Sequence, residues 1–416
     1  MMTTQGTLRP FARPLYVMLK PAGARCNLRC SYCYYLEKAG TAAPHSTLAM
    51  SDELLERFTQ QYIEAQTTPY VLFTWHGGEP LLRPLSFYRK ALELQHRYAG
   101  GHHIDNSLQT NGLLLTDEWC EFLAANHFLV GLSIDGPAWL HDRYRRDHAA
   151  QPTHQRVMHA AELLTKHGVE WNAMAVVSHQ TTLQPLEFYH FFKSAGCQYL
   201  QLTPVVERTT ERNGSPRLLP GMQTGGQLTP ESVTPQGWGR FLCTVYDEWV
   251  RHDVGQLFVL LFDAVLAAWV GEQPGICSLS SLCGHAAVME HNGDVYACDH
   301  FVFPEYRLGN IWQQSLTALM YGERQQQFAR MKTSMLPRQC RECAFLALCY
   351  GECPKNRFTT DAYGQPGLNY LCEGYRMFFS HVADDMQFMA NEWKAGRPPA
   401  NIMQKYATAQ RETRTI

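Results

Sequence analysis

Cysteine is the residue type that most constrains what this chain can be. The sequence contains fourteen cysteines, and eleven of them fall into two clustered regions, one near the start and one in the last third. The N-terminal segment lacks a continuous apolar core and a small-residue cleavage site, so it does not resemble a secretory signal. In a reducing cytoplasm, closely spaced thiols bind metals or act in catalysis more often than they form disulfides. We therefore expect a cytoplasmic protein that binds metal.

The first cluster has the spacing C-x3-C-x2-C and consists of Cys26, Cys30 and Cys33, which follow the first predicted strand. Three thiolates on one short loop can bind three irons of a [4Fe–4S] cluster and leave the fourth iron without a protein ligand. An open coordination site is what a metal centre needs in order to bind a substrate or cofactor directly. The three cysteines alone are also compatible with half of a zinc site. The choice between zinc and an iron–sulfur cluster therefore depends on the surrounding motifs.

The second region holds eight cysteines, which is enough for two complete sets of four ligands. They are Cys277, Cys283, Cys298, Cys340, Cys343, Cys349, Cys353 and Cys372. Sets of four thiolates bind either zinc or iron–sulfur clusters, and ligand number alone does not distinguish them. Two structural zinc ions are therefore the alternative to two clusters. The three isolated cysteines, Cys120, Cys197 and Cys243, are interpreted as small core residues.

Short β-rich segments alternate with helical segments between residues 14 and 205. The predicted strands are 15–19, 71–75, 106–109, 130–134, 172–177 and 200–203. The predicted helices are 51–65, 84–97, 116–126, 155–167 and 184–195. This alternation indicates an α/β fold of right-handed βαβ units with a parallel sheet. Six units predict a partial barrel with its active site at the carboxyl ends of the strands.

The rest of the chain departs from this alternation. Residues 207–236, rich in Gly, Pro and Thr, predict a long surface loop that crosses the sheet. Helices are expected at 237–252 and 256–270, and a further helix at 373–395 before a polar tail. Asn292–Gly293 between two alternating segments predicts a β-hairpin with a type I′ turn. The expected domains are a core barrel at 13–236, a helical linker at 237–276, a cysteine-rich domain at 277–372 and a C-terminal helix and tail at 373–416.

Composition excludes two classes of partner. The formal net charge is −2 and charged residues make up 18% of the chain, so nothing indicates nucleic acid or a charged membrane surface. The most apolar stretch, 257–270, is too short to span a bilayer and contains Asp263. A buried helix is the better interpretation of this stretch.

Three further motifs lie at the ends of successive predicted strands. They are Gly77-Gly78-Glu79-Pro80, Gln109-Thr110-Asn111-Gly112 and Ser133-Ile134-Asp135-Gly136. Together with the C-x3-C-x2-C loop, this order resembles the radical S-adenosylmethionine (SAM) superfamily. The resemblance implies that the first three cysteines hold a [4Fe–4S] cluster whose open iron binds SAM.

The same resemblance implies five contacts to SAM. Tyr32 packs against the cofactor, and the backbone of Gly78 binds its amino group. Ser133 and Arg145 contact the carboxylate and ribose region, and Leu202 meets the adenine. These roles are expectations that come with the family, since each motif taken singly is also a common turn or a solvated charge.

The second cysteine region resembles the SPASM domain, and its spacing is similar to that of the anaerobic sulfatase-maturating enzymes. This resemblance covers residues 13–390 and implies interleaved ligands. Cys277, Cys283, Cys298 and Cys353 would hold auxiliary cluster I, and Cys340, Cys343, Cys349 and Cys372 would hold auxiliary cluster II. It also implies that Asp299 is the catalytic base, whereas an aspartate that merely closes a turn is the structural alternative.

The activity that the resemblance implies is oxidation of a cysteine or serine in a sulfatase polypeptide to Cα-formylglycine. The implied cofactors are three [4Fe–4S] clusters and SAM, and a flavodoxin or ferredoxin is the expected electron donor. One alternative is a SPASM enzyme that crosslinks a ribosomal peptide, and another is a non-enzymatic metal scaffold or electron carrier. Gln109, Asn111 and His76 are candidates for binding the peptide, and the choice between Cys-type and Ser-type substrates stays open.

Overall fold

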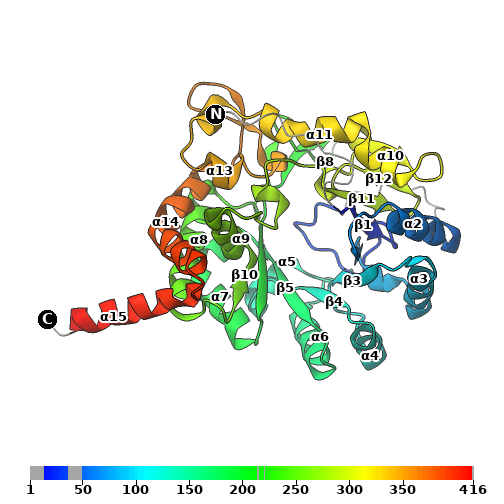
Figure 1. Ribbon diagram of the computed structural model, residues 1–416, viewed down its shortest axis with the longest axis horizontal. Helices are drawn as coiled ribbons and strands as arrows, with labels where there is room; N and C mark the ends of the chain where they lie inside the picture. The colour runs from blue at the N-terminus through cyan, green and yellow to red at the C-terminus, as the bar shows by residue number, and fades with distance from the viewer. Residues whose placement is uncertain (1–13, 36–48, 213–214, 220, 415–416) are drawn as a thin grey trace.

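A continuous sheet with eight parallel strands organises the molecule (Figure 1). The computed structural model describes residues 14–35, 49–212, 215–219 and 221–414. Within these ranges the strand order of the largest sheet is β10-β6-β5-β4-β3-β2-β1-β11-β12-β13. The strands are β1 (Tyr16–Lys20), β2 (Tyr70–Trp75), β3 (His103–Thr110), β4 (Leu129–Ser133), β5 (Trp171–Val177), β6 (Tyr199–Pro204), β10 (Phe258–Val259), β11 (Ala286–Glu290), β12 (Asp294–Tyr296) and β13 (Arg307–Asn310). The six predicted barrel strands and their parallel order are confirmed.

Helices follow the barrel strands and cover the outer side of the sheet (Figure 1). They are α2 (Asp52–Glu64), α3 (Leu85–Tyr98), α4 (Asp117–Ala125), α5 (Ala138–Tyr144), α6 (His154–Lys166) and α7 (Pro185–Ser194). Two begin at side-chain caps, because Ser51 accepts from the Leu54 N–H and Thr116 from the Trp119 N–H. All five predicted helices are present, and α5 is an additional short helix after β4.

The barrel core is aromatic and tightly packed. Phe58 and Tyr62 of α2 stack with ring centroids 5.0 Å apart, and Tyr62 meets Phe73 of β2 edge to face. The Tyr62 hydroxyl donates to the carbonyls of Leu15 and Leu72, which satisfies its polar end within the core. Burial of each such side chain contributes about 1.5–3 kcal/mol of stability. Of the isolated cysteines, Cys120 and Cys197 are buried in this core and Cys243 packs against it, as predicted.

Three helices close the side of the barrel next to β6: α8 (Pro235–His252), α9 (Leu260–Val270) and α14 (Cys372–Lys394). Helices α8 and α14 approach so closely that a Cβ on Gly239 would lie 2.9 Å from the Gly374 Cα. Glycine at both positions therefore permits the backbones to touch. The helices predicted at 237–252, 256–270 and 373–395 are confirmed, except that residues 258–259 form β10 instead of the start of α9.

Two expectations about segments outside the barrel are wrong in detail. The segment 207–236 is not a plain loop, because β7 (Arg208–Arg212), β8 (Ser215–Leu218) and β9 (Gln227–Leu228) form an antiparallel sheet. Gly226, at φ 72°, lets the chain return beside β7. The expected polar tail instead contains the helix α15 (Ile402–Arg414).

The hairpin β11–β12 is present, but its turn is not type I′. A type I′ turn needs positive φ at both central residues, and only Gly293, at φ 86°, has it. The Gly293 N–H donates to the Glu290 carbonyl, so the loop has three residues and ends in a left-handed glycine. The Asn292 side chain accepts from the Asp294 N–H, which stabilises this alternative turn.

No helix among the described residues combines the length and apolar character that crossing a membrane requires. Helix α9, the most apolar, instead packs in the protein with Leu261, Phe262 and Val265 buried. Its one carboxyl group, Asp263, is largely enclosed, and burial raises its pKa to about 6. The helix therefore carries a charge at neutral pH that its surroundings disfavour.

Replacement of this carboxyl group should stabilise the protein in a pH-dependent manner. Because the folded-state pKa of Asp263 lies above its unfolded value, its proton stabilises the fold at low pH, and that contribution is lost as pH rises through about 6. Asp263→Asn should raise the free energy of unfolding by about 1–3 kcal/mol at pH 8 and have little effect at pH 4. Anaerobic thermal unfolding at the two pH values measures this, and an equal effect at both would contradict it.

Candidate active site

The loop that carries the first three cysteines leaves β1 at its carboxyl end and is fixed by backbone contacts. The Arg29 N–H donates to the Arg146 carbonyl at 2.8 Å, and the Ser31 N–H donates to the Tyr144 carbonyl at 3.1 Å. Leu28 forms an isolated bridge with Asp147. The segment after α5 thus serves as a short backbone partner for the cysteine loop.

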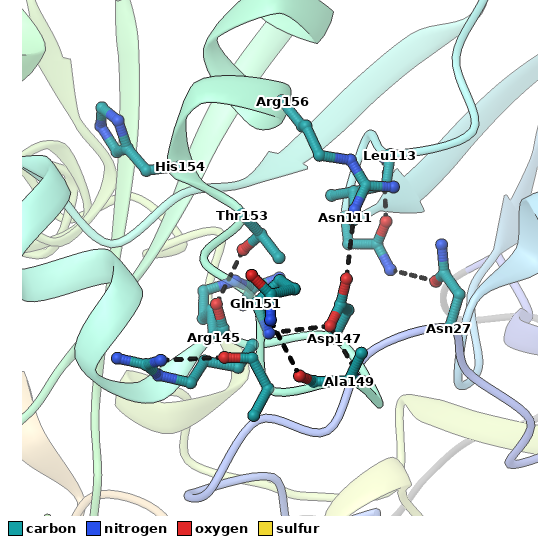
Figure 2. A network of polar contacts seen from close by, with 12 residues as sticks. Asn27, Asn111, Leu113, Arg145, Asp147, Ala149, Gln151, Thr153, His154 and Arg156 are labelled. Atoms are coloured by element: carbon teal, nitrogen blue, oxygen red, sulfur yellow. Dashed lines mark hydrogen bonds and ion pairs between the residues drawn. The ribbon is translucent and has the colours of Figure 1, made fainter.

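Side chains tie the same loop to the end of β3 (Figure 2). Asn111 donates to the Asn27 side chain at 2.7 Å and accepts from the Leu113 N–H. Asp147 in turn accepts from the Ala149 and Gln151 backbone and orders the turn beside it. The candidate peptide contact Asn111 therefore has a structural partner in the cysteine loop.

The glycine turn after β2 packs directly on the cysteine loop. The Gly78 N–H donates to the Gly23 carbonyl, and the Glu79 N–H donates to the Arg25 carbonyl. A Cβ on Gly78 would lie 2.0 Å from the Arg25 carbonyl oxygen, so only glycine fits. An ammonium group only donates hydrogen bonds, so the SAM ammonium group would bind the Gly78 carbonyl, while the Gly78 N–H holds the turn to Gly23.

The three thiols of the loop lie close enough to interact electrostatically. Burial is the main cause that raises the pKa of Cys26 to about 12, and the two neighbouring thiols raise it further. Burial likewise raises the pKa of Cys30 to about 11, although the Arg145 guanidinium opposes it. Burial disfavours the thiolate form of these cysteines, and a bound metal ion would stabilise that form. This loop therefore fits a cationic iron centre.

Tyr32 and Arg145 belong to one buried network beside these thiols. The Tyr32 hydroxyl donates to the Asp135 carboxylate and accepts from Arg145 Nη1 at 3.0 Å. Asp135 also accepts from the Val176 N–H at 3.0 Å. Sequence reasoning recorded the motif that contains Asp135 but gave this residue no role. The pairing of the predicted contacts Tyr32 and Arg145 was not anticipated.

The remaining predicted SAM contacts lie on strands of the same barrel. Ser133 ends β4, and its hydroxyl accepts from the Gln109 side chain at 2.8 Å. Gly131 leaves room for that amide, because a Cβ there would lie 1.9 Å from Gln109 Oε1. Leu202 of β6 is buried in the main core cluster.

Parallel pairing of β11 with β1 brings the second cysteine region to this site. The register sets Lys20 opposite Glu290, and the hairpin returns through β12 to Cys298 and Asp299. Asp299 forms an ion pair with the fully buried Lys20 and accepts a hydrogen bond from the Tyr34 hydroxyl. Both carboxylate oxygens of Asp299 are therefore held by residues that flank the first cysteine loop.

The charge of Asp299 is set by its neighbours. Burial alone would raise its pKa, but the Lys20 ammonium, together with His76 and His300, holds the pKa well below its usual range. Burial lowers the pKa of both His76 and His300 to about 4, so both imidazoles are neutral at pH 7. The site thus contains an ionised carboxylate and two neutral histidines, and His76 is the only one of these neighbours that sequence reasoning singled out.

The eight later cysteines separate into two sets by their electrostatic neighbours. Cys298 interacts with Cys353 and Cys277, and Cys353 interacts with Cys277 and Cys283. Cys349 interacts with Cys372 and Cys340, and Cys372 interacts with Cys340 and Cys343. The members of the second set, Cys340, Cys343, Cys349 and Cys372, all line one cavity. This grouping is the one that the resemblance implies, and the assignment of these thiols as cluster ligands stays a prediction.

Burial raises the pKa of Cys283 in one set and of Cys372 in the other to about 11. In the part of the chain that the structure describes, no three Cys, His, Asp or Glu side chains converge as ligands of one metal ion do. Grouped thiols around a cavity fit a larger inorganic cluster, and thiolates are the usual ligands of such clusters.

Comparison with known proteins gives the class to which this fold and site belong. A model of the radical SAM superfamily matches residues 21–192, and a model of the SPASM iron–sulfur cluster-binding domain matches residues 282–344. Together they define a radical SAM protein with a C-terminal SPASM domain.

Relatives that match nearly the whole chain make the assignment finer. A serine-type anaerobic sulfatase-maturating enzyme of Bacteroides thetaiotaomicron is 58% identical over 95% of this chain and 96% of its own length. A cysteine-type enzyme of Clostridium perfringens is 31% identical over 92% of this chain and 100% of its own. A solved structure of native anSMEcpe with bound AdoMet and Cp18Cys peptide has a TM-score of 0.81, with 31% identity over 91% of this chain and 99% of that one. The chain belongs to the anaerobic sulfatase-maturating enzymes, a family of radical SAM enzymes.

The close approach of Gly78 to the cysteine loop generates a prediction. Gly78→Ala should displace the loop and lower the iron content at the first site, because the added methyl group meets a backbone carbonyl that cannot rotate away. Anaerobic iron and sulfide analysis measures the loss. Arg25→Ala is the matched control, since it removes an exposed side chain but keeps that carbonyl. It should retain wild-type iron and should not rescue Gly78→Ala; full iron in Gly78→Ala would contradict the packing argument.

Proposed function

We propose that this chain oxidises a serine side chain of a sulfatase polypeptide to Cα-formylglycine, and that it also accepts cysteine at the same position. The serine preference is supported by 58% identity to a relative named serine-type. The observation that carries the proposal is the Asp299 carboxylate, held by Lys20 and Tyr34 beside the first cysteine loop. This arrangement joins a candidate base to a candidate radical centre.

The cofactors of the proposed reaction are SAM and three [4Fe–4S] clusters. Cys26, Cys30 and Cys33 hold the first cluster, and the SAM contacts are Tyr32, Gly78, Ser133, Arg145 and Leu202. The sets Cys277, Cys283, Cys298, Cys353 and Cys340, Cys343, Cys349, Cys372 hold the auxiliary clusters I and II. When bound, these groups supply hydrogen-atom abstraction at the substrate Cβ and a path for one electron.

The protein's own task in this scheme is to move a proton and exclude water. Conversion of a hydroxymethyl group to an aldehyde removes one hydrogen atom, one proton and one electron. Asp299 is the proton acceptor, because Lys20 keeps its carboxylate ionised in a buried site. The substrate hydroxyl takes the place of Tyr34 at Oδ2 of Asp299, while Lys20 remains at Oδ1. The hydroxyl group becomes much more acidic once its carbon has lost a hydrogen atom, so a weakly basic carboxylate suffices.

Of the three candidate peptide contacts, His76 has the strongest support. Its neutral imidazole lies near Asp299 and Lys20, and its Nδ1 accepts from the Gly77 N–H, which fixes the ring. Gln109 and Asn111 are already engaged with Ser133 and Asn27. His76 is therefore the residue we assign to contact the substrate hydroxyl.

A cytoplasmic location and a flavodoxin or ferredoxin as electron donor complete the proposal. Both follow from the chemistry of the cysteines. Free thiols in this number persist in a reducing compartment, and iron–sulfur clusters of low potential need a carrier of comparable potential.

A peptide assay tests the function. The purified holoenzyme should convert a sulfatase-type peptide containing serine, and its cysteine counterpart, to an aldehyde that hydrazine trapping and mass spectrometry detect. Asp299→Asn should still cleave SAM but form product on the order of 10²–10⁴-fold more slowly, because the proton acceptor is lost. Asp294→Asn is the matched control: this carboxylate has the same exposure, but it pairs with Arg307 in the hairpin. It should keep wild-type turnover.

Each remaining outcome identifies an alternative. A crosslinked peptide without an aldehyde would indicate a peptide maturase, and absence of SAM cleavage would indicate a scaffold or electron carrier. Unimpaired product formation by Asp299→Asn would remove Asp299 from the mechanism.

A further inference from the structure

Two buried cations lie among the cysteines of the later region. The first is Lys332, near the end of α11 (Glu323–Ser334), whose side chain is fully buried. Its ammonium group donates to the carbonyls of Cys277 and Ser278, each at 2.7 Å. Lys332 therefore holds the backbone at the first cysteine of the Cys277 set.

The second cation is Arg357, which is 2% exposed. Its guanidinium donates to the carbonyls of Tyr350, Gly351 and Glu352, and also to the Lys332 carbonyl at 2.6 Å. The three bonded residues 350–352 all have left-handed backbones, with φ of 47°, 72° and 50°. A Cβ on Gly351 would lie 2.6 Å from Arg357 Nη2, so glycine admits the guanidinium. Arg357 thus fixes the strained link between Cys349 of one set and Cys353 of the other.

The two cations interact with thiols of the later region. Lys332 interacts electrostatically with Cys277 and Cys283. Arg357 interacts with Cys283 and Cys353 of one set and with Cys340 of the other. Within the described ranges both cations bind carbonyl oxygens, and neither forms an ion pair with a carboxylate.

One buried carboxylate lies in the same region. Glu352 interacts with Arg357 and with several thiols, and it accepts from the Asn369 side chain at 2.7 Å. Two cations and one carboxylate leave a net positive charge around the Cys277 set before any cluster is counted. Burial prevents water and salt from screening this charge.

We propose that Lys332 and Arg357 raise the reduction potential of the cluster held by Cys277, Cys283, Cys298 and Cys353, and so make it the electron acceptor of the reaction. This inference rests on the cofactor assignment of the proposed function. A cluster that gains an electron gains negative charge, and a buried cation stabilises the reduced form more than the oxidised one. These two residues tune the acceptor and do not contact the substrate.

The two cations differ in the thiols with which they interact, so the proposal predicts which cluster potential each cation affects. Lys332 donates to the Cys277 and Ser278 carbonyls and interacts with the Cys277 and Cys283 thiols, whereas Arg357 interacts with thiols of both sets. Neutralisation of Lys332 should therefore shift one of the three cluster potentials and leave the other two unchanged. Arg357 is less suitable for a test, because its loss would also release the left-handed link.

The test is an anaerobic redox titration of the holoenzyme, followed by electron paramagnetic resonance. Lys332→Gln keeps an N–H donor for the two carbonyls but removes the charge. It should lower the equilibrium constant for reduction of one cluster at least tenfold, which corresponds to a decrease of about 59 mV in the potential of a one-electron couple. Lys332→Arg keeps the charge and should retain the wild-type potentials. Arg330→Gln is the control, since this partly exposed cation on the same helix pairs with Glu323, and it should shift none.

Three unchanged potentials in Lys332→Gln with full iron content would overturn the proposal, and so would an equal shift of all three. Lys332→Met is the second neutral variant. If neither neutral variant retains about twelve irons per chain, Lys332 only holds the Cys277 loop and the tuning role is wrong. The potentials are measured without substrate, so a shift of one potential would stand even if the peptide assay detected no formylglycine.

Discussion

The parallel pairing of β11 with β1 is the contact on which the rest of the site depends. It adds a hairpin from the C-terminal region to the edge of the barrel sheet, with Lys20 opposite Glu290. Tyr34 and Tyr35 follow the cysteines of the first loop. The buried Tyr35 donates to Glu290, and the Lys20 ammonium lies 3.4 Å from the Tyr35 ring centroid. This pairing delivers Asp299 to the mouth of the barrel, although about two thirds of the chain separates it from Lys20 in the sequence.

Charge burial in this site serves chemistry more than stability. A buried ion pair such as Lys20–Asp299 carries a desolvation cost that its attraction only partly offsets, whereas removal of one partner alone is strongly destabilising. Neutral histidines beside the pair leave Asp299 as the one ionised acceptor in contact with Lys20. The same logic recurs around the later cysteines, where Lys332 and Arg357 are buried and, among the described residues, form no ion pair with a carboxylate. In both places the fold accepts a cost in order to set the charge at a reactive position.

Periodicity and spacing predicted much of this structure. The strand–helix alternation identified the barrel, because buried parallel strands produce apolar runs that short helices separate. The cysteine spacing identified two clustered regions with enough thiols for one set of three and two sets of four. The division of the eight later cysteines came only from the resemblance, because the two sets interleave along the sequence. Asp299 was recognised only through resemblance, because a single aspartate after a hairpin carries no pattern of its own.

Contacts between distant segments could not be predicted. A charged residue at the end of an apolar strand, as Lys20 is, signals a buried ionic partner, but nothing in the sequence identifies that partner as Asp299. Tyr34, Lys332 and Arg357 have partners more than fifty residues away or in irregular backbone, where no periodicity applies. The turn at Asn292 and the small sheet at 208–228 were missed because side-chain hydrogen bonds and local glycine conformations decided them.

A double-mutant cycle between Lys20 and Asp299 tests the central claim most directly. Lys20→Met, Asp299→Asn and the double variant would be compared with the wild type by anaerobic thermal unfolding. The account predicts that the double variant loses less stability than the sum of the single losses, with a coupling of about 1–3 kcal/mol, because each single change strands a buried group. Additive losses would show that the two residues do not meet, and would contradict the pairing of the hairpin with the barrel on which the site is built.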